Sequence, residues 1–199
     1  MAALHRVVYA IARAGAIAGG GMLLLAAVLV AIDITLRTLF ARTLGGADEL
    51  SGYALAIATA WGMSFTLLER AHIRIDSAYA LCPPWLRAAL DVLSLLGMLA
   101  FMALVAWHGW GVLAQTITSS ARSISALGTP LAIPQALWLG GLLVLPLVVT
   151  LLLIEAAVAL ARRDLRGLFG LIGARALQDE LRAELAAAER ERERADGRS

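Results

Sequence analysis

Charge-free apolar stretches dominate the pattern of hydrophobic and polar positions. Four stretches contain no Asp, Glu, Lys or Arg: residues 14–32, 50–68, 92–121 and 123–154. A helix needs roughly 20 mostly apolar residues to cross about 30 Å of hydrocarbon, so each stretch is long enough to span a membrane. The Ser-, Thr-, Gly- and Pro-rich segment 116–134 indicates a connection outside the membrane. The pattern therefore predicts an all-α integral membrane protein with four transmembrane helices, at about residues 14–38, 50–68, 90–113 and 134–158.

The pattern changes on both sides of this membrane domain, which covers residues 14–160. Residues 1–13 form a short N-terminal segment, and residues 161–199 form a polar tail. Within the tail, apolar and polar residues mix at 164–173 in the way typical of an interfacial helix. From residue 174 onward the pattern is again helical and ends in a run of charges. This last helix is either a contact for a partner or a solvated tail.

Composition agrees with a membrane protein and excludes other classes. The 199 residues are 60% hydrophobic and 16% charged, and the mean hydropathy is +0.79. A soluble domain carries about 25% charged residues, so an ordinary cytosolic enzyme domain is excluded. A disordered chain is also excluded, because it needs low hydrophobicity and high net charge. The net charge of +2 gives no reason to expect a nucleic-acid partner.

Arginine placement predicts the orientation, because basic residues are enriched on the cytoplasmic side. The segments before the first span, between the second and third, and just after the fourth contain Arg6, Arg13, Arg70, Arg74, Arg87, Arg162, Arg163, Arg166 and Arg175. The segments on the other side contain Arg37, Arg42 and Arg122. We therefore expect both termini, including the interfacial helix and the C-terminal helix, to be cytoplasmic.

Ionisable groups at membrane depth are candidate functional residues, since each is costly in hydrocarbon. Asp33 and Arg37 are four residues apart and share one helix face. They lie near the outer hydrocarbon boundary, about 15 Å from the centre of the first span. Asp33 is either a ligand for a substrate or ion, or half of an interfacial ion pair with Arg37. The boundary position favours the ion pair.

Two further residues keep other function classes open. His108 lies between Trp107 and Trp110 and predicts either an aromatic interface belt or a haem ligand in a redox membrane anchor. Glu155 directly follows the last charge-free stretch, and a small homodimeric antiporter would need either Glu155 or Asp33 as its essential acid. The sequence shows no metal-ligand spacing, phosphate loop or nucleophile elbow. We therefore expect neither an enzyme nor a cofactor or metal.

Polar residues concentrate at three span ends. Glu49 and Leu50 open the second span, where the helix dipole favours an acid. Residues 69–76 place five ionisable groups in eight positions, which indicates a fixed polar network, a docking surface or a cluster at the lipid headgroups. Residues 129–134 read Thr-Pro-Leu-Ala-Ile-Pro and stiffen the start of the fourth span.

These three segments together resemble the DctQ-type small membrane subunit of tripartite ATP-independent periplasmic (TRAP) transporters. The matching positions of the three motifs are Glu49 and Leu50; Arg70, His72, Ile73, Ile75 and Asp76; and Thr129, Pro130, Leu131, Ile133 and Pro134. The resemblance covers about residues 15–160 in span order and length.

The resemblance implies a non-catalytic scaffold subunit in a bacterial inner membrane. Its partners would be a large multi-span permease subunit, forming a heterodimer, a periplasmic substrate-binding protein and membrane lipids. The large subunit would carry an organic acid with sodium by an elevator motion. We expect the structural or partner-contact residues to be Glu49, Trp61, Arg70, His72, Asp76, Thr129, Pro130 and Pro134. Trp61, Trp107 and Trp110 are expected to face lipid or a partner.

Overall fold

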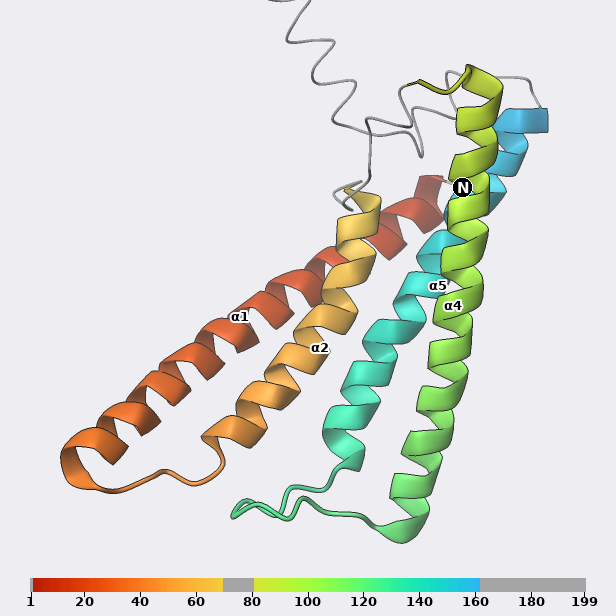
Figure 1. Cartoon of the computed structure of the whole chain (residues 1–199). Helices are drawn as coiled ribbons and strands as arrows, with labels where there is room; N and C mark the ends of the chain where they lie inside the picture. The colour runs from red at the N-terminus through yellow and green to blue at the C-terminus, as the bar shows by residue number, and fades with distance from the viewer. Residues whose placement is uncertain (1, 70–80, 162–199) are drawn as a thin grey trace, which may run out of the picture.

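The computed structural model describes residues 2–69 and 81–161 and contains long helices throughout (Figure 1). The helices are α1 (Ala2–Phe40), α2 (Ala47–Leu68), α4 (Pro84–Ser119) and α5 (Ala132–Ala161). All four are long and apolar enough to cross a membrane. The prediction of four apolar membrane-spanning helices is therefore confirmed at the level of helix length and composition.

The helices extend beyond the predicted spans, and α4 does so by six residues at each end. Pro83 is its N-cap and Pro84 its first residue, a position where the missing N–H of proline costs nothing. At its other end α4 continues to Ser119 and stops at Ser120, whose φ of 48° is left-handed. The connection predicted at 116–134 is therefore shorter and covers residues 120–131.

The helices lie side by side in the order α1, α2, α5, α4 (Figure 1). α1 packs along α2, α2 also packs against α5, and α4 packs along α5, whereas α1 and α5 meet only briefly. We call the end with Ala2 and Ala161 the terminal end, and the end with the connections 41–46 and 120–131 the loop end. The four helices thus form an open layer and not a closed bundle.

Each outer helix contacts the layer through one narrow stripe. On α1 the buried positions Ala12, Gly19, Ala26 and Asp33 are seven residues apart, the spacing of a coiled-coil seam. A Cβ on Gly19 would lie 2.8 Å from Ala58 Cα, so glycine permits this close approach.

The inner helix α5 supplies most of the core near the terminal end. Leu145, Val148 and Val149 are fully buried, and Leu95 of α4 and Leu67 of α2 pack in the same cluster. Burying large aliphatic side chains between two neighbours makes α5 the central element of the layer.

Some sequence predictions lie outside the described residues. These are the interfacial helix at 164–173, the C-terminal helix and the charge run after it. The sidedness of the membrane remains a prediction from arginine placement.

Candidate functional site

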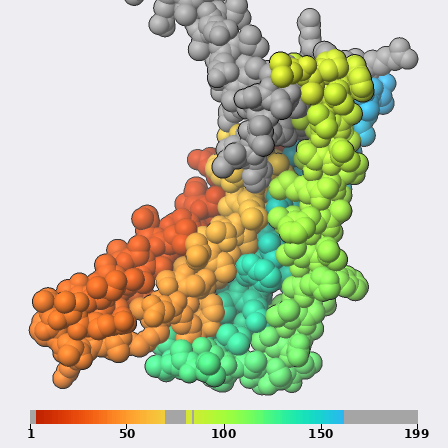
Figure 2. Space-filling model, viewed as in Figure 1, coloured from red at the N-terminus to blue at the C-terminus, as the bar shows by residue number. Residues whose placement is uncertain are grey.

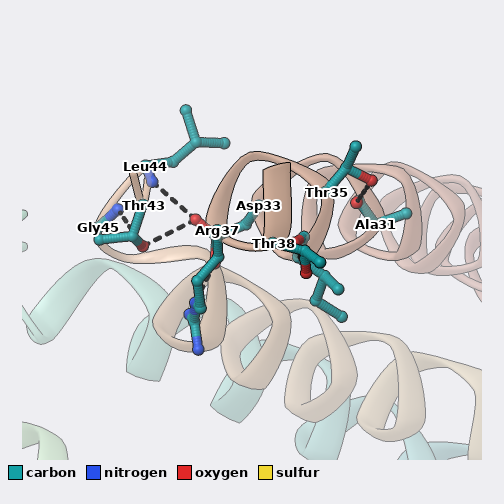
Figure 3. Close-up of polar contacts among 9 residues, drawn as sticks. Ala31, Asp33, Thr35, Arg37, Thr38, Thr43, Leu44 and Gly45 are labelled. Carbon is teal, nitrogen blue, oxygen red and sulfur yellow. Dashed lines mark hydrogen bonds and ion pairs between the residues drawn. The ribbon is translucent and has the colours of Figure 1, made fainter. Parts of the chain in front are cut away.

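Asp33 is the centre of a polar cluster at the loop end (Figure 3). Arg37 Nη2 donates to Asp33 Oδ2 at 2.8 Å, four residues along the same helix. Thr43 Oγ1 and the Leu44 backbone N–H donate to Asp33 Oδ1 at 2.8 and 2.7 Å. Although Asp33 is only 3% exposed, its carboxylate is fully occupied by the end of α1 and the turn that follows. The geometry supports a structural ion pair that fixes the turn into α2.

We expect Asp33→Ala to lower the apparent Tm of the purified protein more than Asp33→Asn does. Alanine leaves the Thr43 hydroxyl, the Leu44 N–H and the Arg37 guanidinium without their acceptor, whereas asparagine keeps one acceptor oxygen. Thr35→Ala is the control, because the Thr35 hydroxyl donates a hydrogen bond to the Ala31 carbonyl within the same helix. Thermal denaturation in a mild detergent gives the apparent Tm of all three variants. Equal Tm values for Asp33→Ala and Thr35→Ala would contradict the assigned role.

Glu49 joins the two connections of the loop end. Tyr53 Oη donates to Glu49 Oε1 at 2.6 Å, and Ser125 Oγ of the 120–131 connection donates to Glu49 Oε2. The hydroxyl of Thr129 lies close enough to interact with the same carboxylate. The structure therefore brings together Glu49 and Thr129, two residues that the sequence analysis had singled out in separate motifs.

The 120–131 connection is a tight hairpin that rests on the other connection. Arg122 and Pro130 form an antiparallel bridge, and Ser123 N–H donates to the Thr129 carbonyl at 2.9 Å. Gly46, with φ of 105°, lies so close that an added Cβ would be 2.4 Å from Leu127 Cδ1. Pro134 is buried in the first turn of α5. The loop end is thus a single packed unit.

A second set of polar contacts lies at the terminal end and uses one face of α1. His5 Nδ1 lies 3.4 Å from Glu155 Oε1 on α5, and Tyr9 Oη donates to Glu69 Oε1 after α2 at 2.8 Å. His5 and Tyr9 are one helical turn apart, so one turn of α1 ties together α2 and α5. The predicted network residues Arg70, His72 and Asp76 lie outside the described residues.

From the sequence we expect Trp61 to face lipid or a partner. In the structure the side chain of Trp61 lies among α1, α2 and α5. Its Nε1–H donates to the Leu137 carbonyl of α5 at 2.9 Å. An added Cβ on Gly15 of α1 or Gly141 of α5 would lie 2.3 or 2.6 Å from the ring. The indole is half-buried, and glycines on both sides make room for it.

Trp107 and Trp110 are strongly exposed on α4, and His108 between them is exposed as well. His5 is held near Glu155 at the terminal end, whereas His108 lies in the loop-end half of α4. The described residues contain no group of three or more His, Cys, Asp or Glu that could hold a metal ion.

One side of α2 is uncovered between its neighbours (Figure 2). We define this uncovered face by its exposed and half-exposed residues: Asp48, Ser51, Gly52, Leu55, Thr59, Gly62, Met63 and Thr66. A groove of about 570 Å³ runs beside it, between the loop-end halves of α1 and α2. Two members of the face are glycines whose added Cβ would meet nothing within 4 Å. Within the described residues, no neighbouring atom therefore packs against these two glycines.

The uncovered face differs chemically from the exposed sides of the outer helices. α1 and α4 expose large apolar side chains: Ile17, Leu24, Leu25, Val28, Leu93, Phe101 and Leu104. The face of α2 carries hydroxyls, and those of Ser51, Thr59 and Thr66 bond to carbonyls of their own helix. Its polar and small positions recur every three or four residues, a signal that was present in the sequence and that our sequence analysis missed.

The chain matches a known protein family. The family model described as "Tripartite ATP-independent periplasmic transporters, DctQ component" matches residues 26–164, more than half of the chain. This range includes all of α2, α4 and α5 and the loop-end part of α1 from residue 26 onward. No curated protein matches the chain.

Proposed function

The chain belongs to the DctQ component family of TRAP transporters, and we propose that it is the scaffold subunit that binds and stabilises the large permease subunit. Membership confirms the resemblance found in the sequence motifs and makes the chain a small TRAP transporter subunit. DctQ proteins function with a large permease and a periplasmic binding protein. We further propose sodium-coupled uptake of an organic acid across a bacterial inner membrane, with both termini of this chain cytoplasmic.

The open layer of helices is the observation that carries the scaffold role. The outer helices α1 and α4 contact the rest of the chain through single stripes and leave their other sides uncovered. The central parts of the four apolar stretches contain no charged residue, and the Asp33 and Glu49 carboxylates are engaged by side chains of the loop end. A chain that offers wide membrane-depth surface and holds the Asp33 and Glu49 carboxylates in structural contacts is suited to support another subunit.

The uncovered face of α2 is the contact that we propose for a transmembrane helix of the permease. In a membrane, helices associate through small residues that let backbones approach and through hydroxyl groups, whereas lipid is well matched by large apolar side chains. The most apolar stretch of α2 is less apolar than the corresponding stretches of the other three helices, and two positions in this face are open glycines. The groove of about 570 Å³ beside it provides space for side chains of the partner helix.

A deletion strain of the native cell that no longer makes this chain tests the scaffold role. We expect the amount of the large permease subunit in the membrane fraction to fall several-fold, because its contact surface is left exposed and the unassembled subunit is degraded. The wild-type chain supplied from a plasmid should restore that amount. A permease that keeps its abundance and its thermal stability without this chain would contradict the proposal.

A further inference from the structure

The groove beside the uncovered face of α2 ends at a carboxylate. Its volume is about 570 Å³, and its walls are α1 from Leu23 to Ile34 and α2 from Asp48 to Leu55. Half of its lining residues are alanine, glycine or serine. Among the described residues that line it, Asp48 alone is charged. Because α2 begins at Ala47, Asp48 lies at the loop end of the groove.

Asp48 also differs from the other acidic residues within residues 2–69 and 81–161. Its carboxylate forms no hydrogen bond or ion pair in this part of the chain. Each of the others takes part in a contact: Asp33, Glu49, Glu69, Asp91 and Glu155. The helix dipole favours an acid in the first turn of α2, but Glu49 already supplies one there. The dipole therefore does not explain why a second acid lines the groove.

The carboxylate indicates what kind of partner fills the groove. Every phospholipid carries a phosphate, and the negative charge of Asp48 repels it. Small residues let the backbone of a second helix approach closely, and both walls offer them, with Ala27 and Ala31 on α1 and Gly52 on α2. An ammonium or guanidinium group at the level of Asp48 would form a charge-assisted hydrogen bond with its carboxylate. A helix with a basic residue therefore fits the groove better than a lipid does.

We propose that the permease helix on the uncovered face of α2 lies along this groove and carries an arginine or lysine that pairs with Asp48. Its small or apolar side chains pack over Ala27, Ala31 and Gly52. Asp48 is four residues from Gly52, so the basic residue lies about 6 Å, or one turn, beyond the level of that glycine. The inference rests on the proposed function, because it specifies the chemistry of the partner at the same surface.

Removing the charge of Asp48 in the full tagged chain, purified from native membranes in a mild detergent, tests the pairing. We expect Asp48→Asn to lower the recovery of the permease at least about fivefold, because the basic residue of the partner loses its counter-charge. Asp48→Glu keeps the charge and should restore the recovery. Arg42→Gln is the control, since Arg42 is an exposed charge of the same loop end that does not line the groove. The apparent Tm of the isolated Asp48→Asn chain should equal that of the wild type.

A photoreactive amino acid in the groove identifies the partner directly. Benzoylphenylalanine replaces Leu55, which lines the groove, or Leu104 on α4 as the matched control; the two leucines are 56% and 57% exposed. After irradiation of native membranes, we expect the Leu55 position to capture a transmembrane segment of the permease. Asp48 is seven residues from Leu55, so that segment should carry an arginine or lysine about two turns from the captured residue. The Leu104 position should capture lipid and not this segment.

The outcomes separate this inference from the scaffold role. Full recovery of the permease with Asp48→Asn would overturn the pairing and leave the scaffold role intact. A captured permease segment without a basic residue at that level, or a phospholipid adduct alone at the Leu55 position, would do the same. If the wild-type chain recovered no permease at all, both the scaffold role and the pairing would be wrong.

Discussion

Gly141→Ala is expected to destabilise the protein strongly, although alanine is the better helix former. The added Cβ would lie 2.6 Å from Trp61 Cδ1 and 2.9 Å from the Trp61 backbone N. The Trp61 ring cannot easily move away from the added Cβ. Gly15 of α1 lies against its other side, and its Nε1–H donates to the Leu137 carbonyl. Overpacking of this kind costs about 1–3 kcal/mol, so α2 and α5 must separate and the apparent Tm in mild detergent should fall.

Gly111→Ala on α4 is the matched control for this effect. An added Cβ there would meet nothing within 4 Å, so it should be neutral or stabilise by up to about 1 kcal/mol through helix propensity. In a Trp61→Leu background the cost of Gly141→Ala should shrink, because the clash with the ring is removed while the clash with the backbone remains. If Gly141→Ala and Gly111→Ala gave the same Tm, the packing assigned to Trp61 would be wrong.

Replacing Gly52 and Gly62 together by leucine is expected to abolish binding of the large permease without unfolding the chain. Both glycines are open in the isolated chain, so leucine costs the fold little. On the uncovered face of α2, two isobutyl groups would hold a partner helix several ångströms away and remove its close contact. We expect co-purification of the permease to fall at least about tenfold, which corresponds to about 1.4 kcal/mol of binding free energy.

The same substitution on α4 separates this effect from a general effect of leucine. Gly97 and Gly111 are equally open but lie on a helix whose exposed side carries Phe101, Leu104 and Trp107. Gly97→Leu with Gly111→Leu should leave permease recovery unchanged. Loss of the permease in the α4 pair and not in the α2 pair would move the proposed contact to α4.

The number and approximate positions of the helices could be predicted from the sequence because each apolar stretch is long enough to span a membrane. The start of α4 was also predictable, since the Pro83-Pro84 pair suits a helix N-terminus. Its end was not. Residues 116–119 were interpreted as loop from their Ser and Thr content, but Ser119 Oγ bonds to the Gln115 carbonyl at 2.8 Å and Thr116 is buried in the helix. Hydroxyls satisfied in this way fit the last turn of a helix.

The candidate site was predictable only where local spacing determines the contact. Four residues separate Asp33 and Arg37, and the structure places them in contact. The Thr43 and Leu44 donors depend on the turn after α1, and the Ser125 bond to Glu49 depends on how two connections pack. Trp61 was assigned to lipid or a partner because the rotation of an apolar helix is set by its neighbours. Its actual position became clear only with Gly15 and Gly141 in place.

Purification of the tagged chain from its native membrane in a mild detergent tests the central claim most directly. A DctQ-family scaffold subunit should elute with one much larger polytopic protein in a one-to-one ratio, identified by mass spectrometry, and the α2 glycine-to-leucine pair should lose that protein. Recovery of the wild-type chain alone, as a clean homo-oligomer, would contradict the scaffold role.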